Sequence, residues 1–269
     1  MIQKLQEAVD AYNEKYSKEG GKALLQWHDA RADDEFESDT EDLEPPKKKK
    51  KKDMDTTPLI LALCSPLMSR AHQFVQQSGD IVFCDASSLD RYNTSLFLLS
   101  TTTPAGAVPL GAILTSDEKE TTIEQGMKML KSILPQNAFF GEGSERGPSV
   151  IMTDDSSPER DALSKVWPSV LLLLCTFHFL QRRWTWLWDA KNGIHNKQDR
   201  SFLINELKAL VYAETEEQLI HLYSAVEKGR VTNKYPNYLE HIQTLGPIDK
   251  NGHTATESAS LFEEITQLC

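Results

Sequence analysis

The chain has 269 residues, close to the upper limit for one hydrophobic core, so we expect one main domain with appended segments. Its 29 lysines and arginines and 40 aspartates and glutamates give a net charge of −11, which by itself argues against a nucleic-acid partner. Its apolar runs fall well short of the roughly 18–20 residues of a membrane span, and the N-terminus has no apolar signal segment, so we expect no membrane contact and no secretion.

The N-terminal segment, residues 1–28, has the spacing of an amphipathic helix. Leu5, Val9, Tyr12 and Tyr16 follow one another at intervals of four, three and four residues, so they share one helix face. Two consecutive glycines then interrupt the pattern. We expect a short helical segment here.

Residues 29–57 have the composition of a disordered linker. They combine a run of carboxylates with two prolines and six consecutive lysines, and their few apolar side chains cannot offset the entropy lost on ordering. A basic cluster beside prolines is also typical of a nuclear localisation signal, so we expect a nuclear protein that an import receptor recognises. The alternative is a solvated segment whose lysines balance the acids before them. The lysines are Lys47, Lys48, Lys49, Lys50, Lys51 and Lys52.

Residues 58–245 have the pattern of an α/β domain, and a polar C-terminal tail at 246–269, either natural or truncated, follows it. The predicted strands lie at 80–85, 95–103, 107–115, 150–153 and 169–175. The predicted helices lie at 118–134, 158–167, 177–188, 202–212 and 214–228. The order β-β-β-α-β-α-β-α favours an antiparallel meander extended by parallel strands, so we expect a mixed five-stranded sheet with flanking helices.

Two aspartates stand where predicted apolar strands end. Asp85 follows Ile-Val-Phe-Cys, and Asp154 follows Val-Ile-Met-Thr. Open α/β sheets bind ligands at the ends of their strands, and two carboxylates from neighbouring strands suit Mg²⁺, which prefers oxygen ligands. The alternative is that each acid only begins a turn or caps the next helix.

The residues around these acids resemble those of Mutator-like element transposases. The similar segments are Ile81–Asp85 with the Ala-Ser that follows, Leu96–Leu99, Val108–Gly111, Ile151–Asp155 and Cys175–His178. In that family a first Asp follows strand one, a second Asp lies in a Thr-Asp pair after strand four, and a Cys-x-x-His comes soon after. The resemblance covers about residues 58–245 and implies an RNase H-like fold that cleaves DNA phosphodiesters and transfers strands.

The resemblance also implies a pair of divalent cations, Mg²⁺ or Mn²⁺, held by Asp85, Asp154 and a late glutamate on a helix. Glu217 is our first candidate, because Ala-x-Thr-x-Glu-x-Leu is similar to the final segment of the family. The alternatives are Glu216, Glu214 and Glu206. Acids in a first helical turn also complement the helix dipole, which is the competing explanation for the three around residue 215.

Zinc is not expected in this chain. Its four cysteines form no C-x-x-C pair, and Cys175 and His178 supply only half of a four-ligand zinc site. We consider two roles for His178: a partly buried structural residue, or a group that helps to hold a scissile phosphate. We expect Cys175 to be structural.

The segment 178–208 reverses the overall charge, because it holds six basic and three acidic residues, a net of +3. Arg182 and Arg183 are therefore candidate DNA contacts. Trp184 and Trp188 lie one helical turn apart, so they either stack on bases or pack against the rest of the domain.

These expectations converge on a metal-dependent DNA transposase domain, complete or a truncated or domesticated copy. The alternative is a catalytically inactive nuclear module that is descended from a transposase and binds DNA or protein. It is motivated by the lack of a zinc-finger or helix-turn-helix pattern before residue 58 and of a Cys/His-rich zinc module after it.

Overall fold

The computed structural model describes residues 2–27, 58–89, 94–154 and 156–243. The predicted linker at 29–57, its six lysines and the tail at 246–269 lie outside the described residues. The chain divides into two compact units, one ending at Leu172 and one beginning at Leu173. This boundary falls within the range 58–245 that the sequence analysis treats as one domain, and each unit is described below by itself.

The first unit is built on a mixed sheet, so the expected α/β class is confirmed, but the sheet has seven strands rather than five. Their order is β1-β2-β5-β4-β3-β6-β7, and β7 is the strand at which the unit boundary lies. Neighbouring strands from β1 to β3 are antiparallel, whereas β6 runs parallel to β3. The strands are β1 (Lys22–Gln26), β2 (Ile60–Cys64), β3 (Ile81–Ser88), β4 (Ser95–Thr103), β5 (Gly106–Thr115), β6 (Val150–Thr153) and β7 (Leu171–Leu174).

The two strands that the sequence analysis missed form the edge beyond β5. The N-terminal segment was expected to be only helical, but it also contains β1, which pairs with β2. Both strands have five residues, and a run this short carries too little periodicity to separate strand from helix. Pairing with β5 decides the matter for β2, because its alternate side chains Ile60, Ala62 and Cys64 become fully buried.

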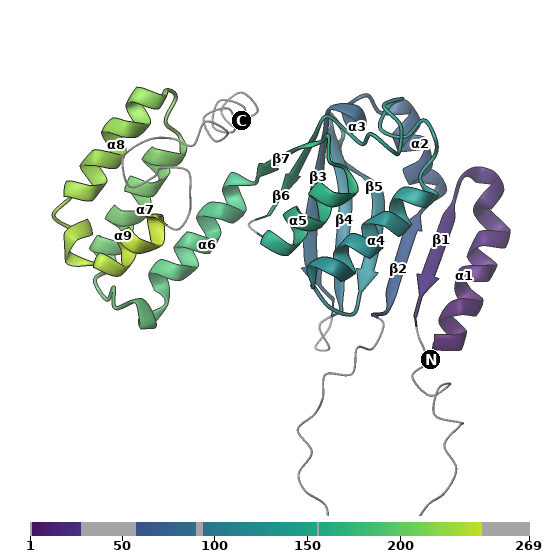
Figure 1. Ribbon diagram of the computed structural model, residues 1–269, viewed down its shortest axis with the longest axis horizontal. Helices are drawn as coiled ribbons and strands as arrows, with labels where there is room; N and C mark the ends of the chain where they lie inside the picture. The colour runs from purple at the N-terminus through teal and green to yellow at the C-terminus, as the bar shows by residue number, and fades with distance from the viewer. Residues whose placement is uncertain (1, 28–57, 90–93, 155, 244–269) are drawn as a thin grey trace, which may run out of the picture. The chain divides into compact units, whose positions relative to one another are not determined.

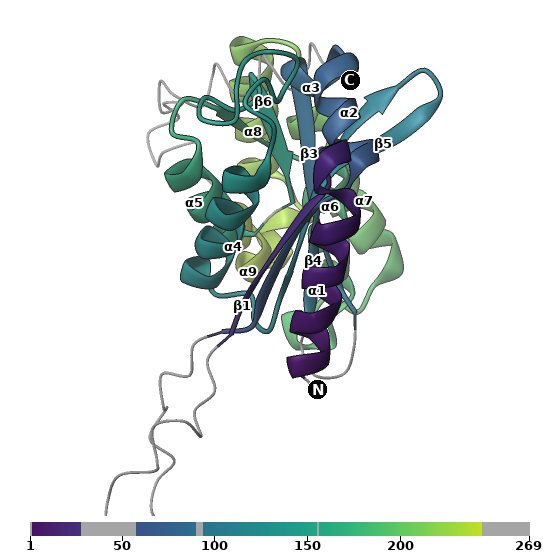
Figure 2. The same cartoon turned by 90° about the vertical axis from the view of Figure 1, so that its right-hand side faces the viewer.

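Helices cover both faces of this sheet. Figure 1 shows α4 and α5 packed next to each other over the strands, and Figure 2 shows α1 on the other side of β1 from α4. The helices of the first unit are α1 (Ile2–Tyr16), α2 (Pro66–Phe74), α3 (Gln77–Asp80), α4 (Glu120–Ile133) and α5 (Ser157–Val166), with a short 3-10 turn, η1 (Ser17–Glu19).

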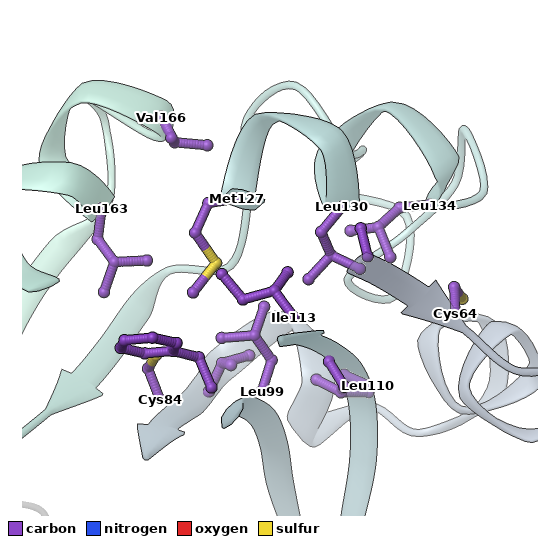
Figure 3. Close-up of a cluster of buried hydrophobic side chains, with 14 of the residues drawn as sticks. Cys64, Cys84, Leu99, Leu110, Ile113, Met127, Leu130, Leu134, Leu163 and Val166 are labelled. Carbon is purple, nitrogen blue, oxygen red and sulfur yellow. The ribbon is translucent and has the colours of Figure 1, made fainter. Parts of the chain in front are cut away.

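The core lies between the sheet and the pair α4 and α5. Figure 3 shows side chains from the strands, such as Cys84 and Ile113, facing Met127 of α4 and Leu163 of α5. A Cβ atom on Gly126 would lie 2.8 Å from Cδ1 of Ile113, so this glycine permits the close approach of α4 to the sheet. The same packing holds α5 in place beside the end of β6.

The second unit is helical within its described residues. Its helices are α6 (Thr176–Trp188), α7 (Lys197–Val211), α8 (Glu216–Lys228) and α9 (Pro236–Gln243), with 3-10 turns η2 (Ala190–Asn192) and η3 (Thr232–Lys234). They share a core that includes Leu187, Leu203, Leu207 and Tyr238. Helix α7 begins five residues earlier than predicted, because the side chain of Asn196 caps it.

None of the helices described here combines the length and the apolar character that are needed to span a bilayer.

Candidate functional site

Strand β3 presents Asp85 to solvent. Along this strand Val82 and Cys84 are buried, whereas Asp85 is exposed, as expected for side chains that alternate between two faces. The strand continues for three residues beyond Asp85 and pairs this residue with Leu98 of β4. Asp85 therefore lies within β3 rather than at its end, and its backbone is held by the ladder.

The pairing of β3 with β6 brings the second aspartate next to the first. The register joins Ile81 to Val150 and Phe83 to Met152, and Asp85 and Asp154 each come two residues after this last pair. Neighbouring strands are about 4.8 Å apart, so the backbones of the two aspartates lie close together. The two aspartates predicted from the sequence are thus brought together by the fold.

A third carboxyl group, that of Glu159, belongs to the same region. It lies in the first turn of α5, its side chain is 0 % exposed, and neither carboxyl oxygen has a hydrogen-bond partner of normal geometry. Burial, together with the charges of Asp154 and Asp85, raises the pKa of Glu159 from 4.5 to about 8. An interaction with the thiol of Cys84 opposes this rise without cancelling it.

Cys84 adds a buried thiol to this arrangement. Burial raises the pKa of Cys84 well above its ordinary value, and the carboxyl groups of Glu159, Asp154 and Asp85 act in the same direction. The thiol therefore stays protonated at neutral pH. We refer to Asp85, Asp154 and Glu159 as the acidic cluster.

The chemistry of the acidic cluster fits a hard divalent cation. Its donors are all carboxyl oxygens, which Mg²⁺ and Mn²⁺ prefer, and the two oxygens of Glu159 are buried without hydrogen bonds. Among the residues that the structure describes, no group of three or more His, Cys, Asp or Glu side chains is already arranged as a metal site. Ligation by all three carboxylates thus calls for rotation of their side chains.

Sequence reasoning missed Glu159, because an acid in a first helical turn is ordinarily explained by the helix dipole. A signal was present, however. Helix α5 begins four residues after β6 ends, so its first turn must lie close to the end of that strand. An acid at this point is therefore brought near any acid that ends the strand.

The four glutamates proposed from the sequence all belong to the second unit, whereas the acidic cluster belongs to the first. Glu217 is exposed on α8, Glu216 begins that helix, and Glu214 is exposed just before it. Glu206 on α7 accepts a hydrogen bond of 3.1 Å from Oγ1 of Thr232, and burial raises its pKa.

Helix α6 carries the candidate phosphate contacts. Arg182 is exposed, but Arg183 is buried and its guanidinium lies 4.8 Å from the ring centre of Phe179. His178 is half-buried and makes an edge contact with the exposed ring of Phe177. Cys175 is a half-buried free thiol that stands just before the helix. Of the two arginines, Arg182 is the one accessible to a phosphate.

The sequence left open whether Trp184 and Trp188 of α6 stack on bases or pack against the domain, and the structure answers this in part. The rings of Trp184 and Trp188 stack with centroids 4.1 Å apart, and the guanidinium of Arg200 lies 4.8 Å from the ring centre of Trp188. Trp188 is half-buried between these two groups, whereas Trp184 stays 44 % exposed at the outer end of the stack.

No model of a known protein family matches this chain, and no curated protein matches it either.

Proposed function

We propose that the chain is a DNA transposase-type catalytic domain of the Mutator-like kind, in which Asp85 and Asp154 hold Mg²⁺ or Mn²⁺ against a phosphodiester. The observation that carries this proposal is the parallel pairing of β3 with β6, because Asp85 and Asp154 each come two residues after the last pair of this ladder, Phe83 and Met152. It is supported by the resemblance of the surrounding sequence to that family. The succession β3-β4-β5-α4-β6-α5-β7-α6, with an antiparallel meander and β6 parallel to β3, agrees with the RNase H-like fold that the resemblance implies.

The chain's own residues have defined tasks in this proposal. Asp85 is held by ladder pairing on β3, and Asp154 directly follows β6, so the backbones of both aspartates are held in place by the sheet. When bound, divalent cations would activate the attacking water or 3′-hydroxyl and stabilise the leaving oxygen. Their positive charge would also offset the acidic surface that a DNA phosphate must approach.

The test is nicking of supercoiled DNA by the full chain with Mg²⁺ or Mn²⁺. We expect Asp85→Asn and Asp154→Asn each to reduce cleavage by about a hundredfold or more, since each removes a charged ligand at the reacting phosphate. Asp161→Asn is the matched control, because Asp161 is an exposed aspartate on the neighbouring helix α5. Cleavage that persists in both variants would refute the proposed mechanism.

DNA contact is assigned to α6, which carries the exposed Arg182 and the exposed Trp184 on different sides of the helix. A cation and an accessible ring suit a phosphate and a base. Trp184→Ala should weaken binding of a single-stranded oligonucleotide by about 1–3 kcal/mol, measured by fluorescence anisotropy at fixed salt. Equal binding by the variant would remove Trp184 from the interface.

A non-catalytic nuclear module that binds DNA is the second candidate, favoured by this same exposed pair on α6. Wild-type chain that binds DNA but cleaves none with either cation would support it. Nuclear location is part of both proposals. A fluorescent fusion in which Lys47–Lys52 are replaced by glutamine should lose nuclear accumulation, and unchanged accumulation would reject the signal.

A further inference from the structure

The most unusual group in the described part of the chain is the carboxyl of Glu159. Its side chain is 0 % exposed, and both oxygens lack a hydrogen-bond partner. Leaving a buried polar group without partners costs folding free energy, on the order of 1–3 kcal/mol. An apolar residue of similar volume at this position would avoid that cost, so packing alone does not explain a glutamate here.

The neighbours of Glu159 do not compensate its charge. Every side chain that acts on the pKa of its carboxyl is a carboxylate or a thiol: Asp154, Asp85, Glu118 and Cys84. Asp154 has a stronger effect than Asp85, as expected if Glu159 reaches the acidic cluster from the side on which β6 ends. A buried carboxyl whose ionisable neighbours are acids and a thiol, with no basic side chain among them, is suited to a cation.

The backbone of Glu159 is well positioned for this role. Pro158 stiffens the first turn of α5, and Ala162, Leu163 and Val166 anchor the helix in the core. The helix therefore fixes the backbone of Glu159 five residues after Asp154. The glutamates of the second unit have ordinary surroundings by comparison: Glu217 is exposed, and Glu206 is hydrogen-bonded by Thr232.

We propose that Glu159 is the third carboxylate ligand of the divalent cation that Asp85 and Asp154 hold, in place of a glutamate from the second unit. This inference rests on the proposed function, because it takes the two aspartates as cation ligands. It goes beyond it by assigning the third ligand to the first turn of α5.

The test is Mn²⁺ binding by the full chain, measured by calorimetry or by the free-Mn²⁺ electron paramagnetic resonance signal, without DNA. Glu159→Gln should weaken binding by at least about tenfold, since losing a ligand should cost no less than losing an outer-shell partner. Glu159→Asp retains a carboxylate and should recover part of the affinity. Glu217→Gln should bind Mn²⁺ as the wild type does, as should the control Asp161→Asn.

The outcomes separate this inference from the proposed function. If Asp85→Asn and Asp154→Asn weaken Mn²⁺ binding but Glu159→Gln does not, the assignment of Glu159 is wrong and the two-aspartate site stands. If Glu217→Gln alone weakens binding further, the third ligand comes from the second unit. If the wild type binds no Mn²⁺, both proposals fail. Circular dichroism of Glu159→Gln checks that any loss of affinity is not a loss of fold.

Discussion

Two fully buried ionisable side chains of the first unit, His72 on α2 and Glu159 on α5, differ in whether their polar atoms have hydrogen-bond partners. Both are 0 % exposed. Both nitrogens of His72 are paired: the amide of Phe139 donates to Nδ1 at 3.2 Å, so Nε2 carries the proton and donates to the carbonyl of Leu110 at 3.0 Å. Glu159 has no such partners.

The hydrogen bonding of a buried ionisable group thus helps to distinguish a structural residue from a candidate functional residue. His72 joins α2 to β5 and to the loop at Phe139 and Phe140, both of which have a φ of 54°. Its role is complete within the fold, because its hydrogen bonds hold a strained turn in place. Glu159 contributes no comparable bond to the fold, which is the reason that we propose a role for it in cation binding.

Replacing His72, whose two ring nitrogens are both hydrogen-bonded, should have the largest effect on the free energy of unfolding. His72→Ala leaves the Phe139 amide and the Leu110 carbonyl unsatisfied and creates a cavity, so we expect it to lower the free energy of unfolding by about 3–5 kcal/mol. Urea denaturation at pH 7 measures this, with the exposed His221→Ala as the control. A cost below that of the control would show that the two bonds are unimportant.

The two groups should also give opposite pH dependences. Burial lowers the pKa of His72 from 6.5 to about 4, so its contribution to stability is present above pH 6.5 and is lost as the pH falls towards 4. The pKa of Glu159 is raised from 4.5 to about 8, so its contribution is present below pH 4.5 and is lost as the pH rises through 8.

Glu159→Gln isolates the pH dependence of stability that is due to Glu159. The variant should remove a decline in wild-type stability that approaches about 1.4 kcal/mol per pH unit between the two pKa values, the slope for one proton. Unfolding is measured from pH 5 to about pH 8 in chelator, so that no cation occupies the acidic cluster. Asp161→Asn should keep the wild-type slope. Because His72 contributes an opposite slope below pH 6.5, the comparison is between the two curves: a wild-type curve parallel to that of Glu159→Gln over this range would contradict the raised pKa of the carboxyl.

The second unit offers a smaller test of the same contrast. Thr232 is fully buried, and its hydroxyl donates a hydrogen bond to the carboxyl of Glu206. Glu206 therefore has a hydroxyl donor, whereas Glu159 has none. Thr232→Val removes this donor with little change in volume and should cost about 1–2 kcal/mol in urea denaturation at pH 7. A further rise in the pKa of Glu206, followed by carboxyl chemical shifts, should accompany it. Unchanged stability and pKa would mean that the bond contributes nothing.

Much of the sheet was predictable, because long apolar runs bounded by turn residues specify strands locally. The predicted strands at 95–103 and 150–153 coincide with β4 and β6. Strands β1 and β2 were missed, because five residues show no decisive period and β1 becomes a strand only by pairing with β2. Helices α2, α3 and α9 were missed as well.

The residues of the candidate site also fall into two groups, those that the sequence predicted and those that only the structure revealed. Asp85 and Asp154 could be found from the sequence, since each follows a recognisable apolar run. Glu159 could not be told apart from other acids of first helical turns, because its burial and its lack of partners arise only when α5 packs on the sheet. Arg183 shows the converse: a basic residue chosen for phosphate contact is buried against Phe179.

The sequence by itself determined the α/β class and the two aspartates, because apolar periodicity and residue chemistry are local properties. It also located the charge: residues 29–57 carry −4 of the net −11, so most of the negative charge belongs to the rest of the chain. Only the tertiary structure decided that β3 pairs with β6, which brings Asp85 and Asp154 onto neighbouring strands, and that Glu159 is buried. Strand register and helix packing depend on residues far apart in the chain, so no local pattern records them.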